Sequence, residues 1–165
     1  MGARDLARAD RREPLSHDAA AEVMRDILAG RRSSDDIREF LLRYNSREAT
    51  SDELAGFLSA VREAATPVSL SPATAGRAID IVGTGGDKSG SVNVSTMAAI
   101  VVAGAGVPVC KHGNRSASSK CGTADVLEAL GARIDLPADL VARCVEKAGF
   151  GFVFAPAFHP AFKHV

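Results

Sequence analysis

The chain has 165 residues, of which 46% are hydrophobic, and its 20 basic and 20 acidic residues give a formal net charge of +0. This balance provides no general affinity for nucleic acid or anionic membrane, and an aromatic content of 5% without Trp argues against a base-stacking surface. Because no apolar run approaches the roughly 20 residues that a membrane-spanning helix needs, we expect partners other than nucleic acid or membrane.

The character of the sequence changes along the chain and predicts four parts. Helical periodicity comes first, and a stretch rich in proline and small polar residues separates it from alternating strand and helix patterns. The four parts are a disordered N-terminus, a helical domain, a linker and a partial α/β domain, at residues 1–15, 16–65, 66–77 and 78–165.

Three amphipathic segments make up the helical domain. Their predicted N-caps are Ser16, then Ser33 or Ser34, and then Thr50 or Ser51 with Glu53 near the capping-box position. In the third segment the apolar residues at helical spacing are Leu54, Phe57, Leu58 and Val61. No polar residues here form a catalytic constellation, so we expect packing and oligomer contact to be the roles of this domain.

Short apolar runs then alternate with helical segments. Strands are predicted at 78–82, 107–110, 133–136 and 150–155, and helices at 95–105, 123–130 and 137–148. Such alternation predicts a largely parallel sheet with right-handed crossovers. The expected fold class is therefore α/β, with a small helical subdomain before an incomplete, largely parallel α/β domain, whose final residues 156–165 read as a loop that enters a further helix.

A glycine-rich loop, Gly83-Thr84-Gly85-Gly86-Asp87, follows the first strand. It is not the dinucleotide-binding GxGxxG, because Lys88 occupies the third glycine position, and it lacks the ending of a P-loop. By itself such a loop is as often a tight turn as a binding site. Four hydroxyl or amide side chains follow, however, where one N-cap needs only one: Ser91, Asn93, Ser95 and Thr96. A phosphate or metal–phosphate complex at this helix N-terminus explains the surplus better than capping does.

The second loop, Lys111-His112-Gly113-Asn114-Arg115, places two cations around a glycine at the end of the next strand. A solvated surface loop is the alternative interpretation. A central strand would instead direct this loop into the crevice where α/β sheets bind ligands, and three more hydroxyls follow at Ser116, Ser118 and Ser119. The cysteines form no CxxC pair, which favours structural, reduced thiols and a cytoplasmic protein: Cys110, Cys121 and Cys144.

Both loops, with Gly122–Gly131, Phe154-Ala155-Pro156 and His159-Pro160, resemble the motifs of the anthranilate phosphoribosyltransferases. The likeness covers nearly the whole chain after the first dozen residues. It implies an enzyme of tryptophan biosynthesis that transfers the 5-phosphoribosyl group of phosphoribosyl pyrophosphate (PRPP) to anthranilate and releases pyrophosphate with the help of Mg²⁺. It also implies a homodimer built through the helical domain.

The resemblance assigns the PRPP contacts to Gly83, Gly86, Asp87, Ser91, Asn93, Val94, Ser95, Thr96, Lys111, His112, Gly113, Asn114, Arg115, Ser116, Ala117, Ser118, Ser119 and Thr123. It places Gly83, Asn114 and His159 near anthranilate, and it makes Ser95 a ligand of Mg²⁺. We expect no catalytic acid, base or nucleophile. Fixed dipoles, Lys111 and the metal would stabilise the leaving group, and orientation of an already nucleophilic amine would supply much of the remaining acceleration.

Members of this family are much longer, and they carry an Asp-Glu pair for Mg²⁺ and an arginine for anthranilate that match no residue here. Two hypotheses follow. The chain is a truncated form of the enzyme, or it is a non-catalytic fragment that retains phosphate binding or a helical dimerisation surface.

Overall fold

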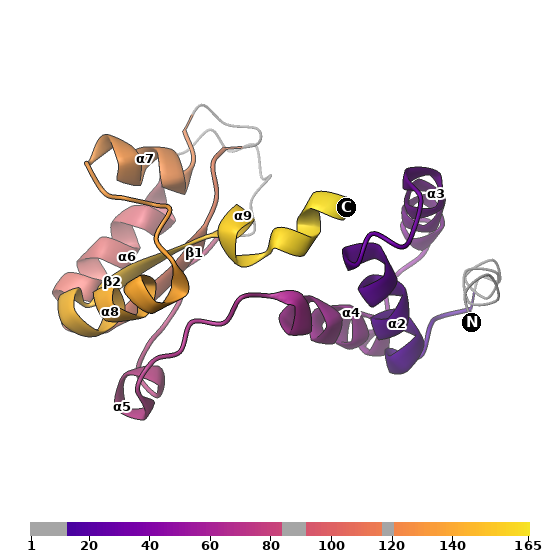
Figure 1. The fold of residues 1–165 in the computed structure, drawn as a ribbon, viewed down its shortest axis with the longest axis horizontal. Helices are drawn as coiled ribbons and strands as arrows, with labels where there is room; N and C mark the ends of the chain where they lie inside the picture. Colours follow the sequence, from indigo (N-terminus) through magenta and orange to yellow (C-terminus); the bar gives the residue numbers. More distant parts are fainter. Residues whose placement is uncertain (1–12, 84–91, 117–120) are drawn as a thin grey trace. The chain divides into compact units, whose positions relative to one another are not determined.

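The structure is a computed structural model that describes residues 13–83, 92–116 and 121–165 (Figure 1). The chain divides into two compact units: residues up to Ala65 together with His159–Val165, and Thr66–Phe158. The last segment thus groups with the helices, whereas the sequence pattern placed it in the α/β domain. No helix within the described ranges has both the length and the apolar character needed to cross a bilayer.

The helical unit contains α2 (His17–Leu28), α3 (Ser34–Tyr44), α4 (Ser51–Ala64) and the 3-10 helix η1 (Pro160–His164). Its three α-helices begin where the sequence predicts. Ser16 accepts a hydrogen bond from Ala19 N, and Ser33 and Thr50 both form complete capping boxes. The capping residues in the sequence therefore predicted the first residues of these helices correctly.

Close approach of α2 and α4 determines which face of α4 is buried. A Cβ on Gly56 would lie 2.2 Å from His17 O, so only glycine allows the two backbones to come this near. Small residues consequently face α2, and the predicted stripe is wrong at Leu54 and Leu58, which are 55% and 56% exposed. The core of the unit is made by Leu15, Ala20, Val23, Ile27, Ile37 and Phe40.

Glu53 is a completely buried carboxylate in this unit. Leu15 N donates to it over 2.8 Å, Thr50 N donates over 3.0 Å, and the guanidinium of Arg47 donates to both of its oxygens. The hydrogen bonds from Arg47 and from these two amides lower the pKa of Glu53 to about 2, against the opposing effect of burial.

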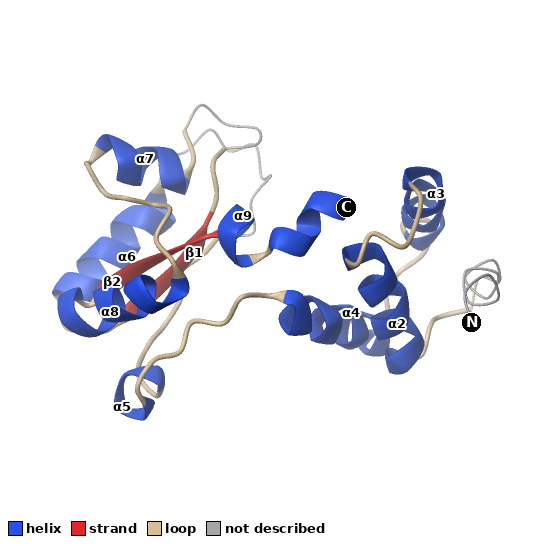
Figure 2. Cartoon of the chain, in the orientation of Figure 1, coloured by secondary structure: helices blue, strands red, loops and turns tan. Residues whose placement is uncertain are grey.

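The α/β unit is built around two parallel strands, β1 (Val109–Gly113) and β2 (Phe150–Phe154), which lie side by side in Figure 2. Their register runs from Val109 opposite Phe150 to Gly113 opposite Phe154. The helices of this unit are α5 (Pro72–Ala75), α6 (Val94–Gly104), α7 (Thr123–Ala129), α8 (Ala138–Ala148) and α9 (Ala155–Phe158). The predicted α/β class and the parallel sheet are confirmed.

The strand predicted at residues 78–82 is reduced to one bridge, between Ile79 and Val109. Side-chain hydrogen bonds replace the ladder beyond that point. Asp80 accepts from His112 N over 3.2 Å, and Ile81 O accepts from Lys111 Nζ over 2.5 Å. A regular strand cannot continue where its main-chain partners are taken by side chains.

Other expectations for this unit also need correction. The strand predicted at 107–110 is shifted toward the C-terminus, because pairing with β2 extends it through residues expected in a loop. No strand forms at 133–136, where Ile134 alone inserts into a core with Ala124, Leu127 and Phe152. The predicted linker contains α5, and α9 and η1 occupy most of the segment that was expected to be a loop.

Candidate functional site

Lys111 of β1 contacts the segments on either side of the first predicted loop. Its side chain is fully buried, and Nζ donates to Ile81 O over 2.5 Å and lies 3.4 Å from Ser95 Oγ. It thus joins the segment before the first loop, the beginning of α6 and β1. Burial lowers the pKa of Lys111, and the charge of Asp80 partly opposes this effect.

Two further contacts link the start of α6 to the second loop. Asn93 is the N-cap residue of α6 but makes no capping hydrogen bond with its side chain, and its Nδ2 donates instead to Gly122 O over 3.1 Å. The hydroxyl of Thr96, itself buried, lies 3.3 Å from the hydroxyl of Thr123. The residues that flank the first loop, Ile81 on one side and Asn93–Thr96 on the other, therefore lie close to the second loop and to the start of α7 through polar contacts.

The cations of the second loop are less accessible than the sequence suggests. The guanidinium of Arg115 hydrogen-bonds to Asp125 over 3.0 Å and to Glu128 over 2.5 Å. These carboxylates raise the pKa of Arg115. Lys111 is buried, so neither cation of the loop is a freely solvated charge. Binding of phosphate by either side chain remains a prediction.

Sequence reasoning gave no role to Asp125, although a signal was available. Asp125 stands three positions after Gly122, the N-cap of α7, which is the spacing of a capping box. Its carboxylate accepts a hydrogen bond from Gly122 N over 2.7 Å. This residue therefore connects α7 to the loop before it.

Several predicted site residues lie outside the described ranges: Gly86, Asp87, Ser91, Ala117, Ser118 and Ser119. Of the residues predicted near anthranilate, Gly83 and Asn114 are exposed in the α/β unit, while His159 belongs to the other unit and packs edge-on against Phe162. Val94 is exposed at the start of α6, His112 is half-buried within β1, and Gly113 ends that strand. Ser116 is half-buried just after the loop.

The described residues do not form a Mg²⁺ site by themselves. Ser95, the predicted ligand, lies beside the Lys111 ammonium group, which is an unfavourable neighbour for a divalent cation. Across residues 13–83, 92–116 and 121–165, no three His, Cys, Asp or Glu side chains gather in a possible metal site. Mg²⁺ prefers carboxylates and substrate phosphates as ligands.

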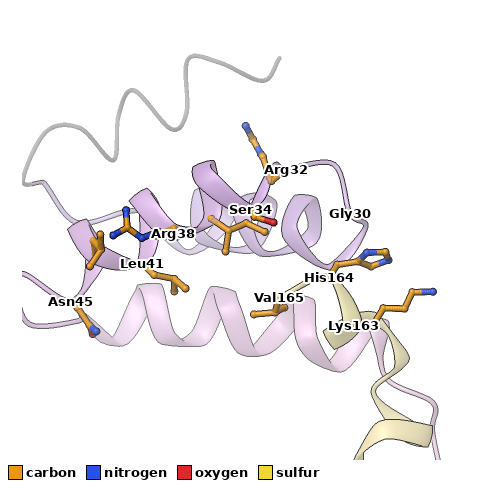
Figure 3. A pocket seen from close by; sticks show the side chains of 11 residues that line it. Gly30, Arg32, Ser34, Arg38, Leu41, Asn45, Lys163, His164 and Val165 are labelled. Atoms are coloured by element: carbon orange, nitrogen blue, oxygen red, sulfur yellow. The ribbon is translucent and has the colours of Figure 1, made fainter.

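A separate pocket of about 620 Å³ lies within the helical unit (Figure 3). Arg38 and Leu41 of α3 contribute to it, as do Lys163, His164 and Val165 from the end of the chain. None of the residues that line it is among the predicted site residues.

Comparison with known proteins connects this arrangement to one group of enzymes. The family described as "Glycosyl transferase family, a/b domain" matches residues 75–165. The chain is 53% identical to an anthranilate phosphoribosyltransferase from Saccharopolyspora erythraea, over 91% of the chain and 42% of that relative.

Two solved structures are also similar. Anthranilate phosphoribosyltransferase from Thermus thermophilus superposes with a TM-score of 0.90 at 44% identity, over 98% of this chain and 48% of that one. The enzyme from Saccharomyces cerevisiae in complex with PRPP and Mg superposes with a TM-score of 0.85 at 27% identity, over 100% of this chain and 50% of that one. The chain thus spans half or less of the length of the proteins that it matches.

Proposed function

The chain belongs to the glycosyl transferase family whose a/b domain matches residues 75–165. We propose that it catalyses the transfer of a 5-phosphoribosyl group from PRPP to anthranilate. The products are N-(5-phosphoribosyl)anthranilate and pyrophosphate. The observation that carries this proposal is the set of contacts that Ile81, Asn93 and Thr96 make with β1 and with the start of α7, in a chain similar to anthranilate phosphoribosyltransferases.

The reaction depends more on fixed dipoles that stabilise the developing charges than on a side chain that reacts with the substrate. As the bond between ribose C1 and pyrophosphate breaks, positive charge grows on the ribose and negative charge on the leaving group. The amine nitrogen of anthranilate forms the new bond to C1 and loses a proton. Preorganised donors around the leaving pyrophosphate stabilise the negative charge, and orientation of the two substrates provides much of the rest.

The polar groups at the start of α6 suit the pyrophosphate end of PRPP. The helix has 11 residues, so its N-terminus carries an appreciable positive dipole, and the hydroxyls of Ser95 and Thr96 lie in its first turn. We propose that PRPP lies between this end of α6 and the second loop, in contact with the residues that the family resemblance assigns. Anthranilate would lie beside Gly83 and Asn114 of the α/β unit.

We propose that Mg²⁺ enters with the phosphate oxygens of PRPP. The described residues fit a magnesium ion poorly alone, and the yeast enzyme structure similar to this chain contains PRPP and Mg together. The metal would supply further neutralisation of the pyrophosphate charge when bound.

We also propose a cytoplasmic homodimer that assembles through the helical unit. Four leucines of this unit are between 46% and 58% exposed: Leu41, Leu42, Leu54 and Leu58. Exposed apolar side chains in such number are typical of a surface that another protein covers. Sedimentation of the wild-type chain and of a Leu54→Glu, Leu58→Glu double variant tests this assembly. We expect a dimer for the wild-type chain and a monomer for the variant.

Calorimetric titration of PRPP into the 165-residue chain, with and without Mg²⁺, tests the main proposal. We expect binding that strengthens with Mg²⁺ and weakens when Asn114 is replaced by Ala, with little change in the free energy of unfolding. Pyrophosphate release in the presence of anthranilate then tests turnover. Full PRPP affinity in Asn114→Ala would contradict the assigned site.

A second candidate is a non-catalytic chain that retains phosphate binding. PRPP binding without pyrophosphate release would select this candidate over the enzyme.

A further inference from the structure

Two segments, Asn114–Ser116 at the end of the second loop and Gly122–Ala124 at the start of α7, lie in direct contact and are called the neck below. A Cβ on Gly122 would lie 2.3 Å from Ser116 N and 2.6 Å from the carbonyl carbon of Arg115, so the two segments leave no room for a side chain at this position. Ala124 N donates to Asn114 O over 3.2 Å, which adds a main-chain bond across the same neck. Close backbone packing and a main-chain hydrogen bond therefore hold the two segments of the neck together.

Asp125 supplies the polar contacts of the neck. One carboxylate oxygen accepts from Gly122 N over 2.7 Å and from Ser116 N over 3.3 Å, and the other accepts from the guanidinium of Arg115 over 3.0 Å. A single side chain thus holds both segments of the neck and the last cation of the loop. The hydrogen bonds from the two amides and from Arg115 keep the pKa of Asp125 low.

Arg115 extends this arrangement to the sheet. Glu128, one turn further along α7, accepts two hydrogen bonds from the guanidinium, over 2.5 Å and 2.8 Å. The same guanidinium lies 5.8 Å from the ring centre of Phe154, at the end of β2. Arg115 is therefore fixed on three sides by the protein.

The neck also contacts the start of α6. Gly122, whose N–H is held by Asp125, accepts with its carbonyl the hydrogen bond from Asn93 at the start of α6. Displacement of Gly122 would move the contact that joins the neck to the start of α6. We propose that Asp125, with Arg115 and Glu128, forms an ionic latch that positions the PRPP-binding groups at the end of the second loop and at the start of α6.

This inference rests on the proposed function, and it assigns Asp125 the role of a positioning residue that does not touch the substrate. It also changes the expected role of Arg115. A cation that binds phosphate directly acts independently of Asp125, whereas a member of the latch loses its effect once Asp125 is removed.

A double-mutant cycle on PRPP affinity separates these two roles. Titrations in the presence of Mg²⁺ compare the wild-type chain, Asp125→Asn, Arg115→Gln and the double variant. Each single substitution removes charge-assisted hydrogen bonds that are partly exposed, so we expect each to weaken binding about tenfold. The double variant is also expected to be about tenfold weaker, because one substitution already opens the latch.

Two further variants separate positioning from general stability. Asp135→Asn is the matched control, since Asp135 pairs with Arg133 on the surface and should keep wild-type affinity. Asp125→Glu retains a carboxylate at a position that favours Glu in capping boxes, and it should recover affinity to within about threefold. Far-UV circular dichroism at the titration temperature verifies that every variant is folded.

Wild-type affinity in Asp125→Asn would overturn the latch, and so would a double variant about a hundredfold weaker than wild type. A wild-type chain that does not bind PRPP at all would overturn the proposed function, and the positioning role with it. These results are distinguishable, because the first two require a wild-type chain that binds.

Discussion

The helical unit and the α/β unit each bury one charged side chain completely, Glu53 and Lys111, and they do so in different ways. Glu53 receives hydrogen bonds from a guanidinium and two amides, so its charge is neutralised locally. Lys111 has a carbonyl and a hydroxyl as its described hydrogen-bond partners. The first charge is satisfied by the fold, and the second connects segments that we propose to bind a ligand.

This difference separates stability from function. A buried charge with a full set of partners is expected to hold its unit together, and its loss should appear in the free energy of unfolding. A buried ammonium group whose partners are neutral adds less to the free energy of unfolding. Its main effect is to position the groups that it hydrogen-bonds.

The largest expected effect on stability comes from Glu53→Gln. The amide would bring a donor against Thr50 N and Arg47 and leave Arg47 without its ion pair, so we expect the free energy of unfolding to fall by about 3 kcal/mol. Glu39→Gln, which breaks an exposed pair with Arg43, is the control and should cost no more than about 0.5 kcal/mol. Urea denaturation measures both, and similar losses in the two variants would contradict the comparison.

Lys111→Met should show the opposite behaviour. Loss of the ammonium group frees Ile81 O and Ser95, so we expect PRPP affinity to fall about a hundredfold. The free energy of unfolding should change by no more than about 1 kcal/mol, because the cost of burying the charge disappears with it. Lys147→Met, on the exposed side of α8, is the control for titration. Equal affinities in the two variants would remove Lys111 from the site.

The third prediction concerns pH. The pKa of Glu53 is lowered from 4.5 to about 2, so its contribution to stability is complete above pH 4.5 and is lost as the pH falls toward 2. At about pH 3 this group alone should have lost about 2 kcal/mol relative to neutral pH. Unfolding of the wild-type chain and of Glu53→Gln across this range isolates the effect, since the variant should have the shallower pH dependence. Parallel pH curves would argue against it.

The smallest expected effect tests the close packing of α2 and α4. Gly56→Ala places a methyl group against His17 O, and the cost of separating the helices, reduced by the better helix propensity of Ala, should be about 1.5 kcal/mol. Gly104→Ala is the matched control, because nothing lies within 4 Å of the added Cβ at the end of α6. Thermal unfolding should show a lower midpoint for the first variant only.

Much of the fold could be predicted because the signals are local. Ser16, Ser33 and Thr50 cap their helices as expected, since a cap depends on residues three or four positions apart. The alternation of apolar strands and helices likewise indicated the parallel sheet that Val109 and Phe150 begin. The contacts of Ile81 and Ser95 with Lys111 agree with the rule that ligand-binding segments follow the carboxyl ends of parallel strands.

Contacts between distant segments decided the rest. The side chains of Leu54 and Leu58 remain exposed because Gly56 brings α4 against a backbone 39 positions away, at His17. Lys111 was expected in a loop and lies instead in a strand, because β1 pairs with β2 there, with Lys111 opposite Phe152, which comes 41 residues later. Both sequence separations are too long to appear in a local sequence pattern.

The sequence by itself determined the helix starts, the α/β class and the family resemblance, because each of these depends on residue types at short, regular spacing. Only the tertiary structure decided which charges are buried, which cations are already bonded to carboxylates, and that Asp125 holds the neck of the second loop. Those properties depend on the local dielectric environment and on hydrogen bonds between elements, and both exist only after the chain has folded.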